Sequence, residues 1–192
     1  MTKKSRIWTG ISALLMLSAY FLPLWQILLE APQYPEGLFL KIWLDGITGN
    51  IDQINGLNHY IGMKFIIVED FIEFKILPYL FGAIVLLGII TAVTGKRKLL
   101  NIWFVVLILF AIVGFTDFYL WEYNYGRNLD PRAAIKVPGM TYQPPLIGWK
   151  HLLNFLAGSL PDTGGIIVGI AGIIVMLVVI YEHRLAKNSK AL

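Results

Sequence analysis

The sequence contains no cysteine, and it has only three histidines and five methionines among its 192 residues. Without cysteine, no disulfide staples the loops and no thiolate is available for metal binding or redox chemistry. A site for a soft metal would therefore use methionine and histidine. The sequence also lacks an internal repeat, a glycine-rich phosphate loop and a Ser/His/Asp grouping, so it offers no motif for phosphate binding or triad hydrolysis.

Charge is absent from four long stretches of the chain. Hydrophobic residues make up 57% of the sequence, whereas soluble domains have about 45–50%. The uncharged stretches cover residues 7–29, 76–94, 99–116 and 163–181. Each is close to the roughly 18–23 residues that a helix needs to cross a bilayer. The sequence predicts an all-α membrane protein, one integral membrane domain over residues 1–192, with transmembrane helices at about 7–29, 76–94, 99–121 and 163–183.

The basic residues predict the orientation of these helices. Nine of them lie at the two termini and in the link before residue 99, where Glu182 is the only acid. The positive-inside rule then places both termini and this link in the cytoplasm, and the long loops 30–75 and 122–162 outside. We therefore interpret the net charge of +4 as an orientation signal, with no nucleic-acid partner. The first stretch is too long for a signal peptide and lacks a cleavage site, so we expect a retained helix.

The two outer loops are expected to form a folded cap. "FLKIW" predicts a short strand, and apolar residues at helical spacing in 65–72 predict an amphipathic helix at the membrane interface. The four prolines of "NLDPRAAIKVPGMTYQPPLIGWK" exclude a regular helix, but its apolar residues favour a rigid loop packed on the first one. "HLLNFLAGSL" is interpreted as a short helix.

The stretch "NGLNHYIGMK" contains the candidate metal ligands of the first outer loop. His59 and Met63 are four residues apart, so they share a face if the stretch is helical. Met140 lies in the second outer loop and, like Met63, follows a glycine. Two thioethers and one imidazole suit Cu(I), which gives the predicted site His59, Met63 and Met140. In the alternative interpretation the methionines fill the core between the loops, and His59 is hydrogen-bonded to an asparagine.

Two acids follow the third stretch, and each has a structural and a functional interpretation. Asp117 and Glu122 lie near the outer membrane surface, where an acid is often functional because burying it is costly. In the structural interpretation they pair with Arg127 or Arg132 or form a hydrogen bond between helix and loop. In the functional interpretation they orient the ligands of a cation or form its point of entry. His151 also faces outward and is interpreted as a residue on a helix surface.

The segments "APQYPEGL", "NGLNHYIGMK" and "NLDPRAAIKVPGMTYQPPLIG" together resemble a small multi-span membrane protein encoded beside nitrous-oxide reductase genes in some bacteria. That protein is associated with the assembly of copper centres or with nitrous oxide respiration. The resemblance covers the two outer segments and the order of the spans. It implies a bacterial inner membrane, periplasmic loops, and a periplasmic copper chaperone or reductase-maturation protein as partner. It supplies no ligand residues.

Two functions of different classes follow. The first is a periplasm-facing protein that handles copper or assists maturation, binding Cu(I) through its outer loops without catalysis. The alternative is a metal-free membrane scaffold or assembly subunit that docks a periplasmic partner. A transporter is disfavoured because no span has a charge near its middle. An enzyme is disfavoured because no pair of nucleophile and base can be named.

Overall fold

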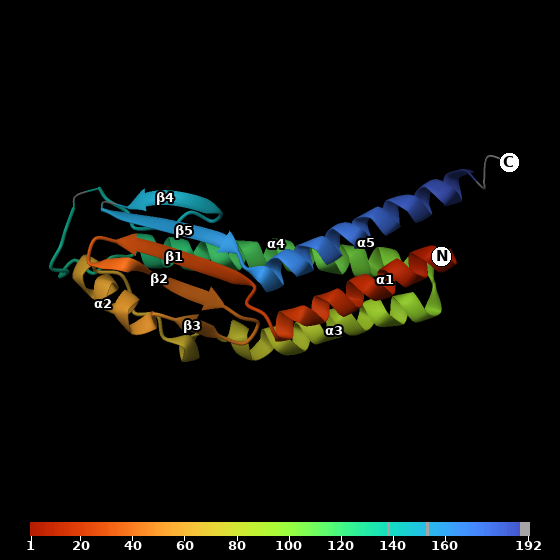
Figure 1. Cartoon of the computed structure of the whole chain (residues 1–192), viewed down its shortest axis with the longest axis horizontal. Coiled ribbons are helices and arrows are strands. Elements are labelled where there is room, and N and C mark those ends of the chain that lie inside the picture. The colour runs from red at the N-terminus through yellow and green to blue at the C-terminus, as the bar shows by residue number, and fades with distance from the viewer. Residues whose placement is uncertain (138, 153, 189–192) are drawn as a thin grey trace.

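The computed structural model describes residues 1–137, 139–152 and 154–188. A helical bundle forms one end of the molecule, and a cap made of a β-sheet and a short helix forms the other (Figure 1). The elements in chain order are α1 (Lys3–Met16), η1 (Leu17–Tyr20), β1 (Trp25–Ala31), β2 (Tyr34–Ile42), β3 (Ile47–Gly49), α2 (Ile51–Ile61), η2 (Val68–Asp70), α3 (Glu73–Thr94), α4 (Arg97–Arg127), β4 (Gly148–Leu152), β5 (Phe155–Pro161) and α5 (Thr163–Asn188).

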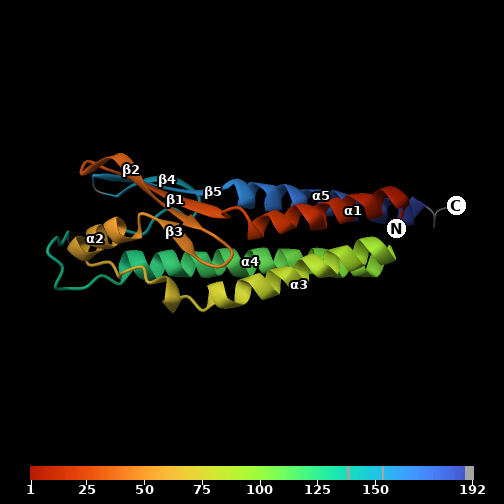
Figure 2. The same ribbon diagram turned by 60° about the horizontal axis from the view of Figure 1, so that its bottom comes forward.

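Three helices of the described chain, α3, α4 and α5, are long and apolar enough to cross a membrane. The chain is therefore a multi-pass membrane protein. In α4 the uncharged part is residues 99–116, about 27 Å of helix, and we treat this part as its membrane-spanning segment. From Asp117 onward α4 continues without a break into the cap, so one helix belongs to both ends of the molecule (Figure 2).

The prediction of a single helix over residues 7–29 is wrong. Helix α1 ends at Met16, η1 adds one tight turn to Tyr20, and Trp25 already begins strand β1. Pro23 contributes to the change from helix to strand, because its ring disfavours helical geometry in the residue before it. Both views place α1 along α3 and α5, so it belongs to the bundle (Figures 1 and 2).

The expectation of an all-α protein is wrong in the cap, which contains a five-stranded antiparallel sheet in the order β3-β2-β1-β5-β4. The strand predicted from "FLKIW" lies in β2, whereas the helix predicted from "HLLNFLAGSL" is replaced by the pair β4 and β5. Ile27 is paired with Leu40 on one side and Ser159 on the other, and all three are buried on one face. Alternation along the strands thus gives this face to the core of the cap.

Helix α2 and the end of α4 cover that inner face. Ile54 of α2 is buried against the sheet residues, and Phe118, Trp121 and Tyr125 of α4 pack on the same cluster. The segment between α2 and α3 is not the predicted amphipathic helix. It contains no α-helix and only the single turn η2. The second outer loop packs on the first, because the Ile135 N–H donates to the Tyr60 carbonyl over 2.9 Å.

Short hydrogen-bonded connections join the sheet to the bundle. Asp162 alone separates β5 from α5, and its N–H donates to the Leu24 carbonyl over 3.1 Å. Its carboxylate accepts from the Thr163 N–H and lies 3.2 Å from the Lys41 ammonium. Burial raises the pKa of Asp162, but the Thr163 N–H and Lys41 outweigh it and hold the pKa below its usual range. The cap is therefore fixed to the bundle at the first turn of α5.

Candidate binding cavity in the cap

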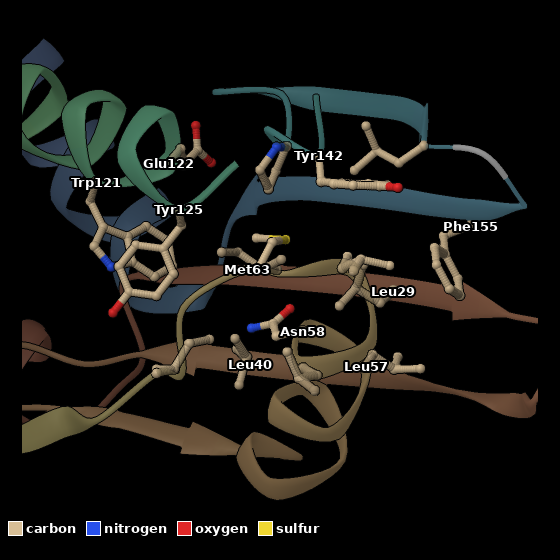
Figure 3. Close-up of a pocket in the computed structure, with 16 residues that line it drawn as sticks. Leu29, Leu40, Leu57, Asn58, Met63, Trp121, Glu122, Tyr125, Tyr142 and Phe155 are labelled. Carbon is tan, nitrogen blue, oxygen red and sulfur yellow. The ribbon is translucent and has the colours of Figure 1, made fainter. Parts of the chain in front are cut away.

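A cavity of about 70 Å³ lies between the inner face of the sheet, α2 and the end of α4. Its wall is apolar, with aliphatic side chains from β1, β2 and α2 and aromatic side chains from α4 and β5 (Figure 3). A water molecule needs roughly 10–15 Å³ of such volume, so the cavity has room for about five water-sized groups. The polar side chains in its wall are those of Asn58, Glu122 and Tyr142, with the indole of Trp121 and the phenol of Tyr125.

The asparagines of "NGLNHYIGMK" shape the wall on the α2 side. The Asn55 side chain donates to the Ile66 carbonyl over 3.0 Å and accepts from the Ile66 N–H over 2.7 Å. The Asn58 amide donates to the Lys64 carbonyl over 3.2 Å. These bonds hold the chain after α2 back against the helix. The polarity of this stretch is thus largely explained by structure.

A left-handed glycine turns Met63 into the cavity wall. Gly62 ends α2 with φ of +80°, and the Met63 N–H donates to the Asn58 carbonyl over 2.9 Å. A Cβ on Gly62 would lie 2.9 Å from the Ala133 Cβ, so both the turn and the close loop require glycine. Met63 enters the cavity wall from the segment after α2, and Glu122 enters it from α4 (Figure 3).

A second glycine brings the proline-rich loop over Glu122. A Cβ on Gly126 would lie 2.3 Å from the Gln143 backbone, and the Tyr142 N–H donates to the Gly126 carbonyl over 2.8 Å. Gly126 and Glu122 are four residues apart, so they share one face of α4. Tyr142 and Pro144 of this loop line the cavity together with Glu122, whose side chain is buried.

Glu122 has 0% exposure, and neither of its carboxyl oxygens has a hydrogen-bond partner in the described structure. The two nearby cations are occupied by Gln143. The Lys150 ammonium donates to its carbonyl over 3.0 Å, and Arg127 Nε donates to its side-chain oxygen over 3.2 Å. Burial raises the pKa of Glu122 to about 8, and the weaker influence of Lys150 opposes it. At neutral pH this carboxyl is mainly the uncharged acid.

The structure separates the predicted ligands by environment. Met63 lines the cavity, but His59 and Met140 do not. His59 is exposed, and its ring stacks on Phe65 with centroids 6.0 Å apart. Met140 is half-buried, and its N–H donates to the Val137 carbonyl over 3.1 Å. In the described residues no cluster of three His, Asp or Glu side chains suits a metal ion.

The remaining residues with two interpretations also have clear environments. Asp117 is exposed on α4. Neither Arg127 nor Arg132 pairs with Glu122: Arg127 donates to Gln143, and Arg132 forms an ion pair with Asp130 at 3.2 Å. His151 lies on strand β4 and not on a helix. The residue that sequence reasoning underrated is Glu122. Its signal was an acid set among aromatic residues in "YLWEYNYG".

Comparisons with known proteins add no assignment: no family model, curated protein or solved structure matches the chain. The resemblance to proteins encoded beside nitrous-oxide reductase genes therefore stays a prediction from the quoted segments.

Proposed function

We propose that the chain is a membrane-anchored binding protein that holds a small molecule in the cap cavity and performs no catalysis. The observation that carries this proposal is the Glu122 carboxyl, which is fully buried in the cavity wall without a partner. Leaving a buried polar group unsatisfied costs about 1–3 kcal/mol. A structure that keeps such a group beside an open space gains most when a ligand fills the space and bonds to it.

The surrounding residues support a binding role. Gly126 and Gly62 lack a side chain, so the backbone near Gln143 and the loop at Ala133 can pack closely against them. A Cβ at either glycine would lie within 3 Å of these segments. The side chains of Asn55 and Asn58 hold a third segment, the chain after α2, through the carbonyls of Ile66 and Lys64. The Trp121 indole N–H and the Tyr142 hydroxyl, also in the cavity wall, are likewise buried without a partner in the described structure. A preformed, mainly apolar chamber with a few polar groups is the usual form of a small-molecule site.

The test compares the wild-type protein with Leu57→Trp, which fills the cavity from α2 without changing Glu122. Both proteins, reconstituted in nanodiscs, are dialysed against a small-molecule extract of the source cells and analysed by mass spectrometry. We expect at least one compound retained by the wild type and lost from the variant. Identical retained compounds, or none in either protein, would contradict the proposal.

Copper handling is the second candidate, and Met63 is the observation that favours it. Its thioether lines the same cavity as the unpartnered Glu122, so a soft and a hard donor face one space. In this candidate His59 and Met140 would complete the Cu(I) site after movement of the outer loops. A periplasmic copper chaperone or reductase-maturation protein would exchange the ion.

Competition between the protein and a Cu(I) chelator tests this candidate. The variants are His59→Ala, Met63→Ala and Met140→Ala, with Met176→Ala in α5 as the matched control. The copper candidate requires weaker binding in the first three variants and wild-type binding in the control. Equal affinity in all four would remove the ligand assignment.

We infer that the cap faces the periplasm of a bacterial inner membrane and that both termini are cytoplasmic. The basic residues of the termini and of the turn before α4 support this orientation. We also infer a fourth crossing by α1 with η1, because their 14 and 4 residues give roughly 29 Å of chain along α3 and α5.

A further inference from the structure

We propose that the ligand of the cap cavity is a small uncharged molecule with a short aliphatic body and one head group that both donates and accepts hydrogen bonds, such as a primary amide. This inference rests on the proposed binding function and names the chemical class of its ligand. Three features carry it: the two free oxygens of Glu122, the occupied state of the neighbouring cations, and the apolar wall.

The head group follows from the chemistry of the Glu122 side chain. Both of its oxygens are unpartnered, and neither is exposed. An uncharged carboxylic acid offers one O–H donor and one carbonyl acceptor side by side. A primary amide has the complementary pair, so it can accept from the Glu122 O–H through its carbonyl oxygen and donate to the Glu122 carbonyl through its N–H. An alcohol can make both bonds only through a single oxygen.

A cationic ligand is disfavoured by the surroundings of Glu122. It would need the ionised carboxylate in a wall formed mainly by aliphatic and aromatic side chains. Taking both charges out of water costs several kcal/mol per ion, and additional hydrogen bonds must repay it. Lys150 and Arg127, the cations next to this segment, already donate to Gln143. A metal ion would meet one thioether in the cavity wall, that of Met63.

The body of the ligand follows from the size and lining of the cavity. Leu29 and Leu40 from the sheet and Leu57 and Ile61 from α2 contribute aliphatic surface. A volume of about 70 Å³ holds about five water-sized groups, which corresponds to a molecule of roughly five or six heavy atoms. Longer acyl chains exceed this space, so we exclude membrane lipid tails from the class.

Two probes of equal chain length distinguish the classes. Butanamide is uncharged and carries the paired donor and acceptor, whereas butylammonium carries a charge. Both dissolve in water, so partition into the bilayer stays small. Binding to nanodisc-reconstituted protein is measured at pH 7 by ligand-observed NMR for the wild type, Glu122→Gln, Glu122→Leu and Leu57→Trp. Glu122→Gln retains one donor and one acceptor, while Glu122→Leu retains neither.

We expect butanamide to bind the wild type and Glu122→Gln with affinities within about threefold. Losing both hydrogen bonds should weaken binding to Glu122→Leu about tenfold or more, since each bond is worth on the order of 1 kcal/mol. Leu57→Trp should not bind. Binding of butylammonium that disappears in Glu122→Gln would overturn the proposed ligand class and leave the binding function intact. Failure of both probes, together with an empty dialysis experiment, would show a cavity that holds only water and would overturn both proposals.

Discussion

Replacing Glu122 by glutamine should stabilise the protein at neutral pH. The pKa of this carboxyl rises from an ordinary value of 4.5 to about 8 on folding, because burial disfavours the charged form. At pH 7 the folded protein must therefore take up a proton that the unfolded chain has released. This proton uptake lowers the free energy of unfolding by about 3 kcal/mol, since each pH unit between the ordinary pKa and the solution pH contributes about 1.36 kcal/mol.

Glutamine removes this cost, because it is uncharged in both states and nearly the same shape. For a chain of this length, about 3 kcal/mol corresponds to a rise of roughly 6–12 °C in Tm. The difference from the wild type should depend on pH with a definite sign. Below the unfolded-state pKa of Glu122, the wild-type protein keeps its full stability. The wild type loses stability as the pH rises from that pKa through the folded-state pKa of about 8. The gain should therefore be near zero at pH 4, grow to pH 7 and level off above about pH 8.

The assay is thermal unfolding followed by tryptophan fluorescence in a mild detergent at pH 4, 6, 7 and 8.5. Glu36→Gln, on the exposed part of β2, is the control and should leave Tm unchanged to within about 1 °C. A Glu122→Gln protein that is less stable than the wild type at pH 7, or that shows the same Tm difference at every pH, would refute the argument that Glu122 is buried without a partner.

Three further predictions follow from other contacts. Gly126→Ala should lower Tm in the same assay and weaken butanamide binding, because its Cβ would lie 2.3 Å from the Gln143 backbone; a Tm equal to the wild type would contradict the close contact. Asp162→Asn should remove acid sensitivity below about pH 4, because the lowered pKa of Asp162 gives stability that is lost as the pH falls through it; parallel Tm curves for the two proteins would argue against this. A cysteine introduced at Lys136 should react with an impermeant thiol reagent in intact cells, whereas one in the turn between α3 and α4 should react only after lysis; the native chain has no cysteine to interfere.

The membrane helices were predictable because a bilayer imposes a simple requirement on sequence. An uncharged run of about 20 residues has few alternatives to a helix in lipid, and α3, α4 and α5 match the predicted stretches. The sheet was harder to predict. The run 7–29 is uncharged throughout, so hydropathy did not separate the helix from strand β1. The local signal in this run is Pro23, which disfavours helical geometry in the residue before it.

The candidate site was predictable in part. Met63, one of the predicted ligands, does line the cavity. The isolation of Glu122 could not be predicted, because it depends on where Gln143 places its carbonyl and amide oxygens relative to Lys150 and Arg127. Those contacts join residues that are 7 and 16 positions apart in sequence through an irregular loop. No periodic pattern reports such geometry.

The unbroken course of α4 has a mechanical consequence. Glu122 and the lipid-facing residues of α4 belong to one rigid rod, with no proline or hinge between them. A ligand that pushes against the carboxyl end of this rod exerts a torque on its other end, and α5 is tied to the sheet through Asp162 at the opposite side of the cap. Filling the chamber would therefore be transmitted as a change in tilt between two membrane helices, so the turn before α4 would move when a space at the other end of the same helix is occupied.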